Sequence, residues 1–203
     1  MNELSVGFGR SVITPDAGVE IFGYFQTRYT EGVLDDLEAN VLALTKGEAT
    51  VLVVSLDLCM IGREDADIIR AAVSEQTKVP FDAIYMAATH THTGPAVYSN
   101  HDDEKIRNYF TVLTEQIIAA SVQALTDQKP AKMGWRVGNA SNIAFNRRFR
   151  MKDGTVRTNP GRGNPDIDGP IGVVDERVSV VRFDQEEGDS LVLVHYGMHP
   201  DTV

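Results

Sequence analysis

Two histidines one residue apart, His90 and His92, are the residues of this sequence best suited to chemistry. They lie in the octet 88–95, Ala-Thr-His-Thr-His-Thr-Gly-Pro, where an apolar stretch runs into a turn. Neutral imidazole is the most common protein ligand of catalytic metals, and loops at the ends of strands often carry catalytic groups. Alternate residues of an extended segment share a face, so both rings could point into one pocket. The octet therefore predicts part of a metal-dependent active site.

The other polar residues near apolar stretches are candidates to complete such a site. A catalytic zinc usually takes three protein ligands and leaves a fourth position for water. The best distant candidate is His199, which follows an apolar stretch near the end of the chain. His101 is better explained as a solvated loop histidine and His195 as a residue of a strand. Asp57 could orient a ligand histidine, but a polar strand end explains it equally well.

Several well-known catalytic patterns are absent. The metallo-β-lactamase pattern His-x-His-x-Asp-His fails because Gly94 and Pro95 occupy its last two positions. The sequence contains no His-Glu-x-x-His and no Gly-x-Ser-x-Gly motif. The single cysteine, Cys59, lies in an apolar run and is expected to be a small buried hydrophobe. Neither an intrachain disulfide nor a cysteine-rich zinc knuckle is therefore expected.

Strands and helices that would position these residues can be predicted from the hydrophobic pattern. Apolar residues at helical spacing predict helices over 63–75 and 103–125. The stripe of the second helix comprises Ile106, Tyr109, Phe110, Leu113, Ile117 and Ala120. Extended segments are expected at 4–15, 40–44, 50–57, 83–88, 132–137, 178–183 and 190–195. The continuous apolar run 51–54 is typical of a strand covered on both faces. Long loops rich in glycine are expected at 17–36 and 146–175, and such loops are often functional.

This order of elements predicts a mixed β-sheet layered with helices, in an α/β or α+β arrangement. The length of 203 residues suits a single domain. In open sheets of this kind, sites gather at the carboxyl ends of strands. Asp57 and His90 would both lie at such ends, and the last expected strand leads to His199. The candidate residues are therefore expected at one edge of the sheet.

Composition limits the classes of partner. The formal net charge is -10, which argues against nucleic acid and against electrostatic docking to anionic lipid. This negative charge is compatible with an apolar small-molecule substrate. No signal peptide and no apolar stretch of membrane-spanning length is visible, so we expect a cytoplasmic chain. The oligomeric state is left open by the sequence.

Short motifs spread over nearly the whole chain carry a further indication. In chain order they are 6–10 with 13–15, 22–24, 55–58, the octet 88–95, 146–148 with 158–160, and 199–200. Together they resemble the N-terminal catalytic region of the neutral (non-lysosomal) ceramidases and their bacterial relatives. The octet differs from the signature of that family only by Thr93 in place of serine.

The resemblance implies a zinc amidase that cleaves the N-acyl bond of ceramide to give sphingosine and a fatty acid, a reaction of sphingolipid metabolism. Carried over residue by residue, it implies that His90 and His199 are zinc ligands. His92 would lie beside the metal as a hydrogen-bonding or proton-transfer group. Arg147 would stabilise the oxyanion, although the adjacent Arg148 could take this role. Zinc lowers the pKa of bound water and polarises a carbonyl, which suits the cleavage of an unreactive amide.

The resemblance also implies that the site is incomplete in this sequence. The family takes a glutamate and a tyrosine ligand from beyond the second histidine, whereas this sequence ends at Val203. We therefore expect either a C-terminally truncated fragment that is nearly inactive or a naturally short relative. Two alternatives stay open: a zinc hydrolase of a different amide or ester, and a non-catalytic binding domain that retains the fold.

Overall fold

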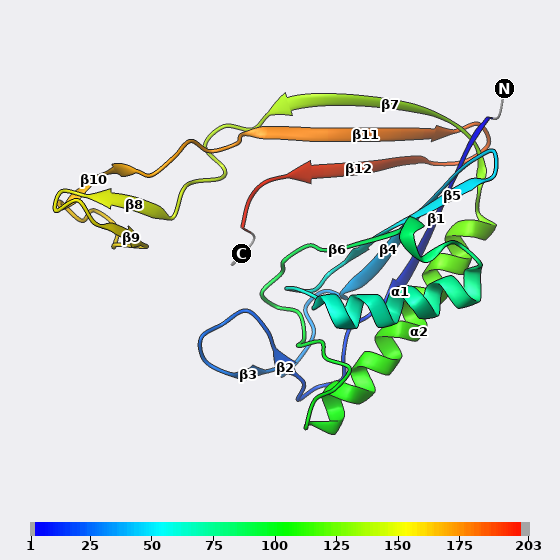
Figure 1. Cartoon of the computed structure of the whole chain (residues 1–203), viewed down its shortest axis with the longest axis horizontal. Helices are drawn as coiled ribbons and strands as arrows, with labels where there is room; N and C mark the ends of the chain where they lie inside the picture. The colour runs from blue at the N-terminus through cyan, green and yellow to red at the C-terminus, as the bar shows by residue number, and fades with distance from the viewer. Residues whose placement is uncertain (1–2, 200–203) are drawn as a thin grey trace. The chain divides into compact units, whose positions relative to one another are not determined.

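The computed structural model describes residues 3–199, and its main feature is a seven-stranded mixed sheet (Figure 1). The strand order is β12-β11-β7-β1-β4-β5-β6. The strands are β1 (Leu4–Val12), β4 (Glu38–Lys46), β5 (Ala49–Leu56), β6 (Ile84–Ala88), β7 (Lys129–Asn139), β11 (Arg177–Gln185) and β12 (Ser190–Tyr196). The helices are α1 (Arg63–Thr77), α2 (Glu104–Thr126) and the short 3-10 turn η1 (Phe81–Ala83). The predicted mixed sheet with helices is confirmed.

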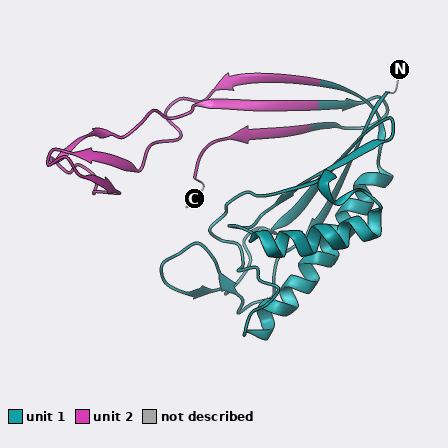
Figure 2. Ribbon diagram, in the orientation of Figure 1, with its two compact units in different colours: residues 1–133, 183–191, 200–203 teal, residues 134–182, 192–199 magenta. Residues whose placement is uncertain are grey.

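The chain divides into two compact units (Figure 2). Within the described residues, the first unit comprises 3–133 and 183–191, and the second comprises 134–182 and 192–199. The chain crosses from one unit to the other within β7, β11 and β12. The interpretation of residues 1–203 as one domain stays a prediction.

The core of the first unit lies between the two helices and one face of strands β1, β4, β5 and β6, as Figure 1 shows. Leu52, Val54 and Leu56 of β5 are fully buried, whereas Val51 is 39% exposed. The expectation that this strand is covered on both faces is therefore wrong. The reason is that both helices pack on the same face, so successive residues of β5 alternate between core and surface.

Helix α2 supplies more buried residues to this core than any other single element. The six residues of its predicted apolar stripe are all buried, namely Ile106, Tyr109, Phe110, Leu113, Ile117 and Ala120. The carboxylate of Asp103 caps the helix by accepting a hydrogen bond from the Lys105 N–H at 2.8 Å. None of the helices within residues 3–199 is both long and apolar enough to cross a membrane.

Two glycines of β1 bring α2 unusually close to the sheet. A Cβ atom added at Gly7 would lie 2.0 Å from the Ala124 carbonyl oxygen, and one at Gly9 would lie 2.0 Å from the Ala120 carbonyl oxygen. Real Cβ atoms never approach backbone this closely. The Gly-x-Gly pattern at positions 7–9 therefore lets the helix backbone rest directly on the strand.

The end of β11 returns to the edge of β1 in the first unit. The side-chain amide of Gln185 donates to the Val6 carbonyl oxygen at 2.8 Å and to the Asp127 carboxylate at 3.3 Å. The Phe8 N–H donates to the same carboxylate at 3.0 Å. Burial alone would raise the pKa of Asp127, but these hydrogen bonds and the nearby Lys129 ammonium outweigh it and lower the pKa. Asp127 is therefore held as a carboxylate at this edge.

The second unit contains a separate three-stranded sheet in the order β10-β8-β9. Its strands are β8 (Arg148–Met151), β9 (Val156–Thr158) and β10 (Ile167–Pro170). The prediction of one long loop over 146–175 is therefore wrong in part. These strands are short and mostly exposed, and of their residues only Met151 is buried. With three or four residues each, they are too short for an alternating apolar pattern to identify them in the sequence.

Candidate functional site

The octet begins where two parallel strands end side by side. Strands β5 and β6 pair in parallel up to Leu56 and Ala88. Beyond them the chain continues the pairing, because the Thr89 N–H donates to the Leu56 carbonyl at 2.9 Å and the His90 N–H to the Leu58 carbonyl at 2.9 Å. The expected position of Asp57 and His90 at neighbouring strand ends is confirmed.

The ring of His90 is held in one orientation by the backbone of Cys59. Its Nδ1 lies 2.7 Å from the Cys59 carbonyl oxygen. A carbonyl only accepts hydrogen bonds, so Nδ1 carries the proton and Nε2 of the neutral ring carries the lone pair. His90 also has a left-handed backbone, with φ of 67°. Such strain in a non-glycine residue concentrates at functional sites.

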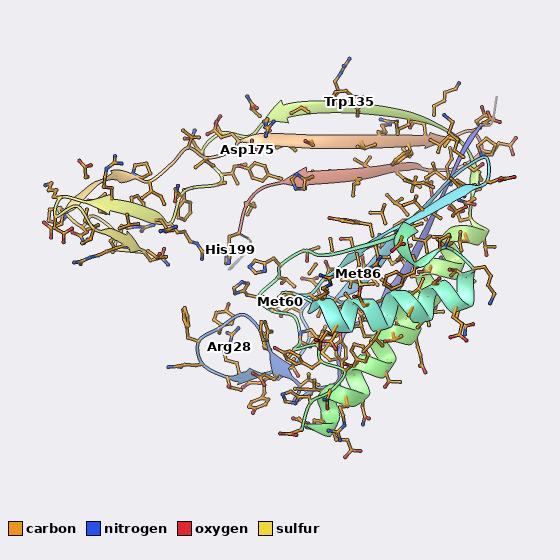
Figure 3. All side chains as sticks on the ribbon, viewed as in Figure 1. Arg28, Met60, Met86, Trp135, Asp175 and His199 are labelled. Atoms are coloured by element: carbon orange, nitrogen blue, oxygen red, sulfur yellow. The ribbon has the colours of Figure 1, made fainter. Side chains whose placement is uncertain are left out.

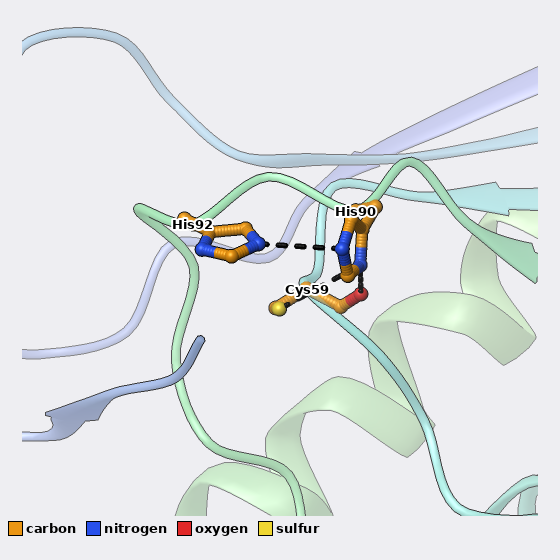
Figure 4. Close-up of side chains that lie close together, drawn as sticks. All are labelled: Cys59, His90 and His92. Atoms are coloured by element: carbon orange, nitrogen blue, oxygen red, sulfur yellow. Dashed lines mark hydrogen bonds between the residues drawn. The ribbon is translucent and has the colours of Figure 1, made fainter. Parts of the chain in front are cut away.

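His92 faces this lone pair, as the close-up in Figure 4 shows. It is buried, and its Nε2 lies 3.3 Å from the Nε2 of His90. The two rings are nearly perpendicular, at 88°, with centroids 4.8 Å apart. The two rings approach each other as predicted, but His90 has a left-handed backbone, so the octet is not an extended segment at this point.

Cys59 completes a group of three that we name the Cys59–His90–His92 cluster. The Cys59 Sγ lies 3.7 Å from the Nδ1 of His90, and one ligand atom from each residue lies within 4.8 Å of the others. Two imidazoles and a thiol are a donor set that suits zinc, so these residues could hold a metal. Sequence reasoning expected Cys59 to be buried, which is confirmed, but missed its place in the cluster. A sequence clue was available, because Cys59 follows the strand β5 that pairs with β6, the strand before the octet.

The long loop predicted over 17–36 lies along the octet. Its short strands β2 (Glu20–Ile21) and β3 (Arg28–Tyr29) form a hairpin. The Phe22 N–H donates to the Gly94 carbonyl at 3.1 Å, and the Ala96 N–H donates to the Glu20 carbonyl at 2.8 Å. Backbone hydrogen bonds therefore hold both ends of the octet, the first at the ends of β5 and β6 and the second against the loop 17–36.

Aromatic and charged side chains of the same loop pack around His92. The ring of Tyr24 meets the His92 ring edge to face at 5.6 Å. The Arg28 guanidinium stacks over Tyr24 at 3.6 Å and donates from Nη2 to the His92 carbonyl at 3.4 Å. Figure 3 shows Arg28 on this loop. These contacts restrict the rotation of His92.

Gly23→Ala is expected to destabilise the first unit and displace His92. A Cβ there would lie 2.7 Å from the His92 Nδ1 and 3.0 Å from the Cys59 Sγ, in a backbone with φ of 103°. Strain and overpacking together should cost about 2–4 kcal/mol. Urea unfolding measures this loss. The control Gly32→Ala, with nothing within 4 Å, should change stability by less than about 1 kcal/mol. Equal effects of the two substitutions would contradict the packing at Gly23.

The Asp57 side chain links the ends of neighbouring strands by hydrogen bonds. Its carboxylate accepts from the Glu38 N–H at 3.0 Å and from the Thr89 hydroxyl at 3.3 Å. The group that orients the His90 ring is the Cys59 carbonyl instead. Asp57 therefore steadies the residue before His90.

The two histidines that sequence reasoning set aside both lie in structured positions. His195 belongs to β12, as expected, and its side chain is exposed. His101 was expected to be a solvated loop histidine, but it is half-buried and stacks on Tyr98 with ring centroids 5.6 Å apart. Its Nδ1 accepts from the Asp103 N–H at 3.1 Å, so it supports the start of α2.

The remaining predicted site residues lie in the second unit. Arg147 is exposed immediately before β8, and its carbonyl accepts from the Asn159 N–H at 2.8 Å. The Arg148 N–H donates to the side chain of Asn146 at 3.0 Å, so the motifs 146–148 and 158–160 lie together. His199 is half-buried just beyond β12 (Figure 3), and Pro200 lies outside the described residues. Zinc binding by His199 and oxyanion stabilisation by Arg147 stay predictions.

Comparisons with known proteins point to one group of enzymes, although no protein family model matches the chain. The chain is 27% identical over 207 residues to neutral ceramidase A of Dictyostelium discoideum, an alignment that covers 96% of this chain and 28% of that protein. The resemblance to the neutral ceramidases is confirmed. Two of the segments that carry this resemblance, the octet and residues 22–24, lie against one another.

Solved ceramidase structures share the fold. A structure described as a ceramidase complexed with C2 matches with a TM-score of 0.69 and 20% identity, over 96% of this chain and 31% of that one. The neutral ceramidase from Pseudomonas aeruginosa matches with a TM-score of 0.64 and 21% identity, over 94% of this chain and 31% of that one. The chain therefore spans less than a third of the length of these ceramidases.

Proposed function

We propose that the chain carries part of the active site of a zinc-dependent hydrolase of N-acyl amide bonds. The proposed substrate is a ceramide-like lipid, and the products are a sphingoid base and a fatty acid. The observation that carries the proposal is the pair of Nε2 atoms of His90 and His92, 3.3 Å apart at the end of β6. The similarity to neutral ceramidase A over 96% of the chain supports the choice of substrate.

Each residue of the proposed site would have a different role. When bound, zinc would supply a Lewis acid for the carbonyl and a water of lowered pKa. His90 would hold the metal through Nε2, because the Cys59 carbonyl keeps its Nδ1 protonated. His92 would hold or move a proton at its Nε2 beside the scissile bond. Arg147 would stabilise the developing oxyanion, and His199 would be the second metal ligand.

Exposed apolar side chains of the loop 17–36 support a lipid-like substrate. The side chains of Phe25 and Leu34 are fully exposed, and those of Tyr29 and Val33 are more than half exposed. They belong to the loop that packs against His92. An acyl chain that reached the cluster would meet this apolar surface.

The test is hydrolysis by the protein made from the complete reading frame that contains these residues. We expect chelation to abolish the cleavage of ceramide and added zinc to restore it. Short N-acyl amides and esters are tested beside ceramide. Faster cleavage of those compounds would replace the substrate but keep the zinc chemistry, whereas no hydrolysis and no bound zinc would favour a non-catalytic binding domain. We propose that residues 1–203 alone are nearly inactive, because two histidines hold zinc weakly.

A further inference from the structure

We propose that Arg28 is a positioning residue that fixes the orientation of His92 through two contacts. One contact runs through the ring of Tyr24, and the other reaches the backbone carbonyl of His92. The inference gives a role to two residues that the proposed function does not use. It rests on the proposed function for the part that His92 plays in hydrolysis, but the contacts themselves can be measured without a substrate.

Backbone pairing sets where Arg28 stands relative to the octet. Ile21 of β2 pairs with Arg28 of β3. The same Ile21 forms a separate β-bridge with Pro95, the last residue of the octet. Arg28 and the octet are therefore held in register through one shared residue. The base of the Arg28 side chain is placed near His92 by the main chain, before any side-chain contact is made.

The guanidinium of Arg28 makes both contacts at once. Its central carbon lies 3.6 Å from the centroid of the Tyr24 ring, where a cation is attracted to the aromatic face. From its edge, Nη2 donates a hydrogen bond to the His92 carbonyl at 3.4 Å. A planar group can stack with its face and donate with its edge, whereas the compact ammonium of a lysine cannot do both. The arrangement therefore requires an arginine.

The ring of Tyr24 passes this constraint to the imidazole. The two rings are nearly perpendicular, at 85°, with centroids 5.6 Å apart. The backbone of Gly23 lies against the same imidazole, since a Cβ there would be 2.7 Å from the His92 Nδ1. Gly23 has no side chain to rotate, but Tyr24 is 38% exposed and could turn towards solvent. The stacked guanidinium holds Tyr24 against the imidazole.

This hold acts on the atom that would carry out chemistry. The Nε2 of His92 lies 3.3 Å from the Nε2 of His90, and the proposed function has it hold or move a proton. Rotation of the His92 ring would carry Nε2 away from this position. A displacement of about 1 Å at a reacting group can lower a rate by about 100-fold. Because Arg28 would touch no reacting atom, its loss should affect kcat and leave KM nearly unchanged.

Kinetics of the complete protein with Arg28→Met tests this effect. The substitution keeps an apolar stem but removes the guanidinium. We expect kcat for amide hydrolysis to fall by about 10–100-fold and KM to change by less than about 2-fold. The matched control is Arg63→Met, which removes an arginine of α1 whose side chain is 93% exposed, and it should keep both constants. A raised KM with unchanged kcat would overturn the proposal, because Arg28 would then bind the substrate.

A double-mutant cycle tests whether Arg28 acts through Tyr24. Tyr24→Leu should lower kcat by itself, because the imidazole loses the ring that packs against it. In that background, Arg28→Met should lower kcat by less than about 3-fold more, since residues that act as a unit are not additive. Losses that multiply in full would mean that the two residues act independently, which contradicts the proposal.

Nuclear magnetic resonance of the 203-residue chain separates this proposal from the proposed function. The unsubstituted chain should show nuclear Overhauser contacts between the rings of His92 and Tyr24, and His92→Gln identifies the signals. Arg28→Met should weaken these contacts, whereas Arg63→Met should keep them. Their absence from the unsubstituted chain, or their persistence in Arg28→Met, would overturn the positioning role. If the contacts behave as expected but the unsubstituted complete protein hydrolyses no amide, the proposed function fails and the fixing of His92 by Arg28 stands.

Discussion

His90→Ala is expected to lower the zinc affinity of the complete protein by at least about 100-fold and to abolish zinc-dependent amide hydrolysis. Loss of a hydrogen-bonding partner behind a metal ligand commonly weakens binding by about 10–100-fold, so loss of the ligand itself should do at least as much. The ring of this proposed ligand is also held in one orientation, since its Nδ1 lies 2.7 Å from the Cys59 carbonyl oxygen. Zinc content and the rate of ceramide cleavage are the two measurements.

The matched control is His195→Ala, which removes an exposed imidazole from β12. It should leave zinc content and hydrolysis unchanged. The thermal unfolding of both variants shows whether each is folded at the assay temperature. If folded His90→Ala kept its zinc and its activity, the assignment of His90 as a ligand would be wrong.

Gly9→Ala is expected to destabilise the protein by about 3 kcal/mol or more, the upper end of the range for overpacking. The added methyl group would lie 2.0 Å from the Ala120 carbonyl oxygen and 2.7 Å from the Ala124 backbone nitrogen. These are backbone atoms of α2 and cannot rotate away as a side chain could. To relieve the clash, the helix would have to move off β1 and lose part of the packing of its buried stripe.

Gly138→Ala makes the same chemical change in a strand with open space around the new methyl group. It should alter stability by less than about 1 kcal/mol, or slightly increase it by restricting the unfolded chain. Urea unfolding of the two variants and the parent compares them directly. A Gly9→Ala protein as stable as the parent would mean that α2 does not rest on β1 as described.

Much of the fold could be predicted because local patterns determine it. The stripe of α2 repeats at helical spacing, and each of its six predicted residues is buried. The strands near 40–44 and 50–57 and the final hairpin were found for the same reason. Whether a strand is covered on one face or two depends on where helices pack, which is why the exposure of Val51 was missed.

The site could be predicted only in part, because its geometry joins distant segments. The octet was recognised by its histidines, but the left-handed backbone of His90 breaks the extended period, so the approach of the two rings comes from the turn that follows β6. Cys59 lies 31 positions from His90, and no periodicity links the two. The close approach of Gly23 to His92 likewise exists only after the loop 17–36 pairs with the octet. Such contacts follow from strand order, which a single sequence specifies weakly.

The amide of Gln185 has a consequence for the order in which the protein is made. Its partners Val6 and Asp127 lie 179 and 58 positions earlier in the chain. During synthesis from the N-terminus, the Cys59–His90–His92 cluster and both helices are therefore complete well before this side chain emerges. The edge of β1 still lacks this hydrogen-bond donor when all three residues of the cluster have already been synthesised. Closure of this edge is therefore a late step in the synthesis of the chain.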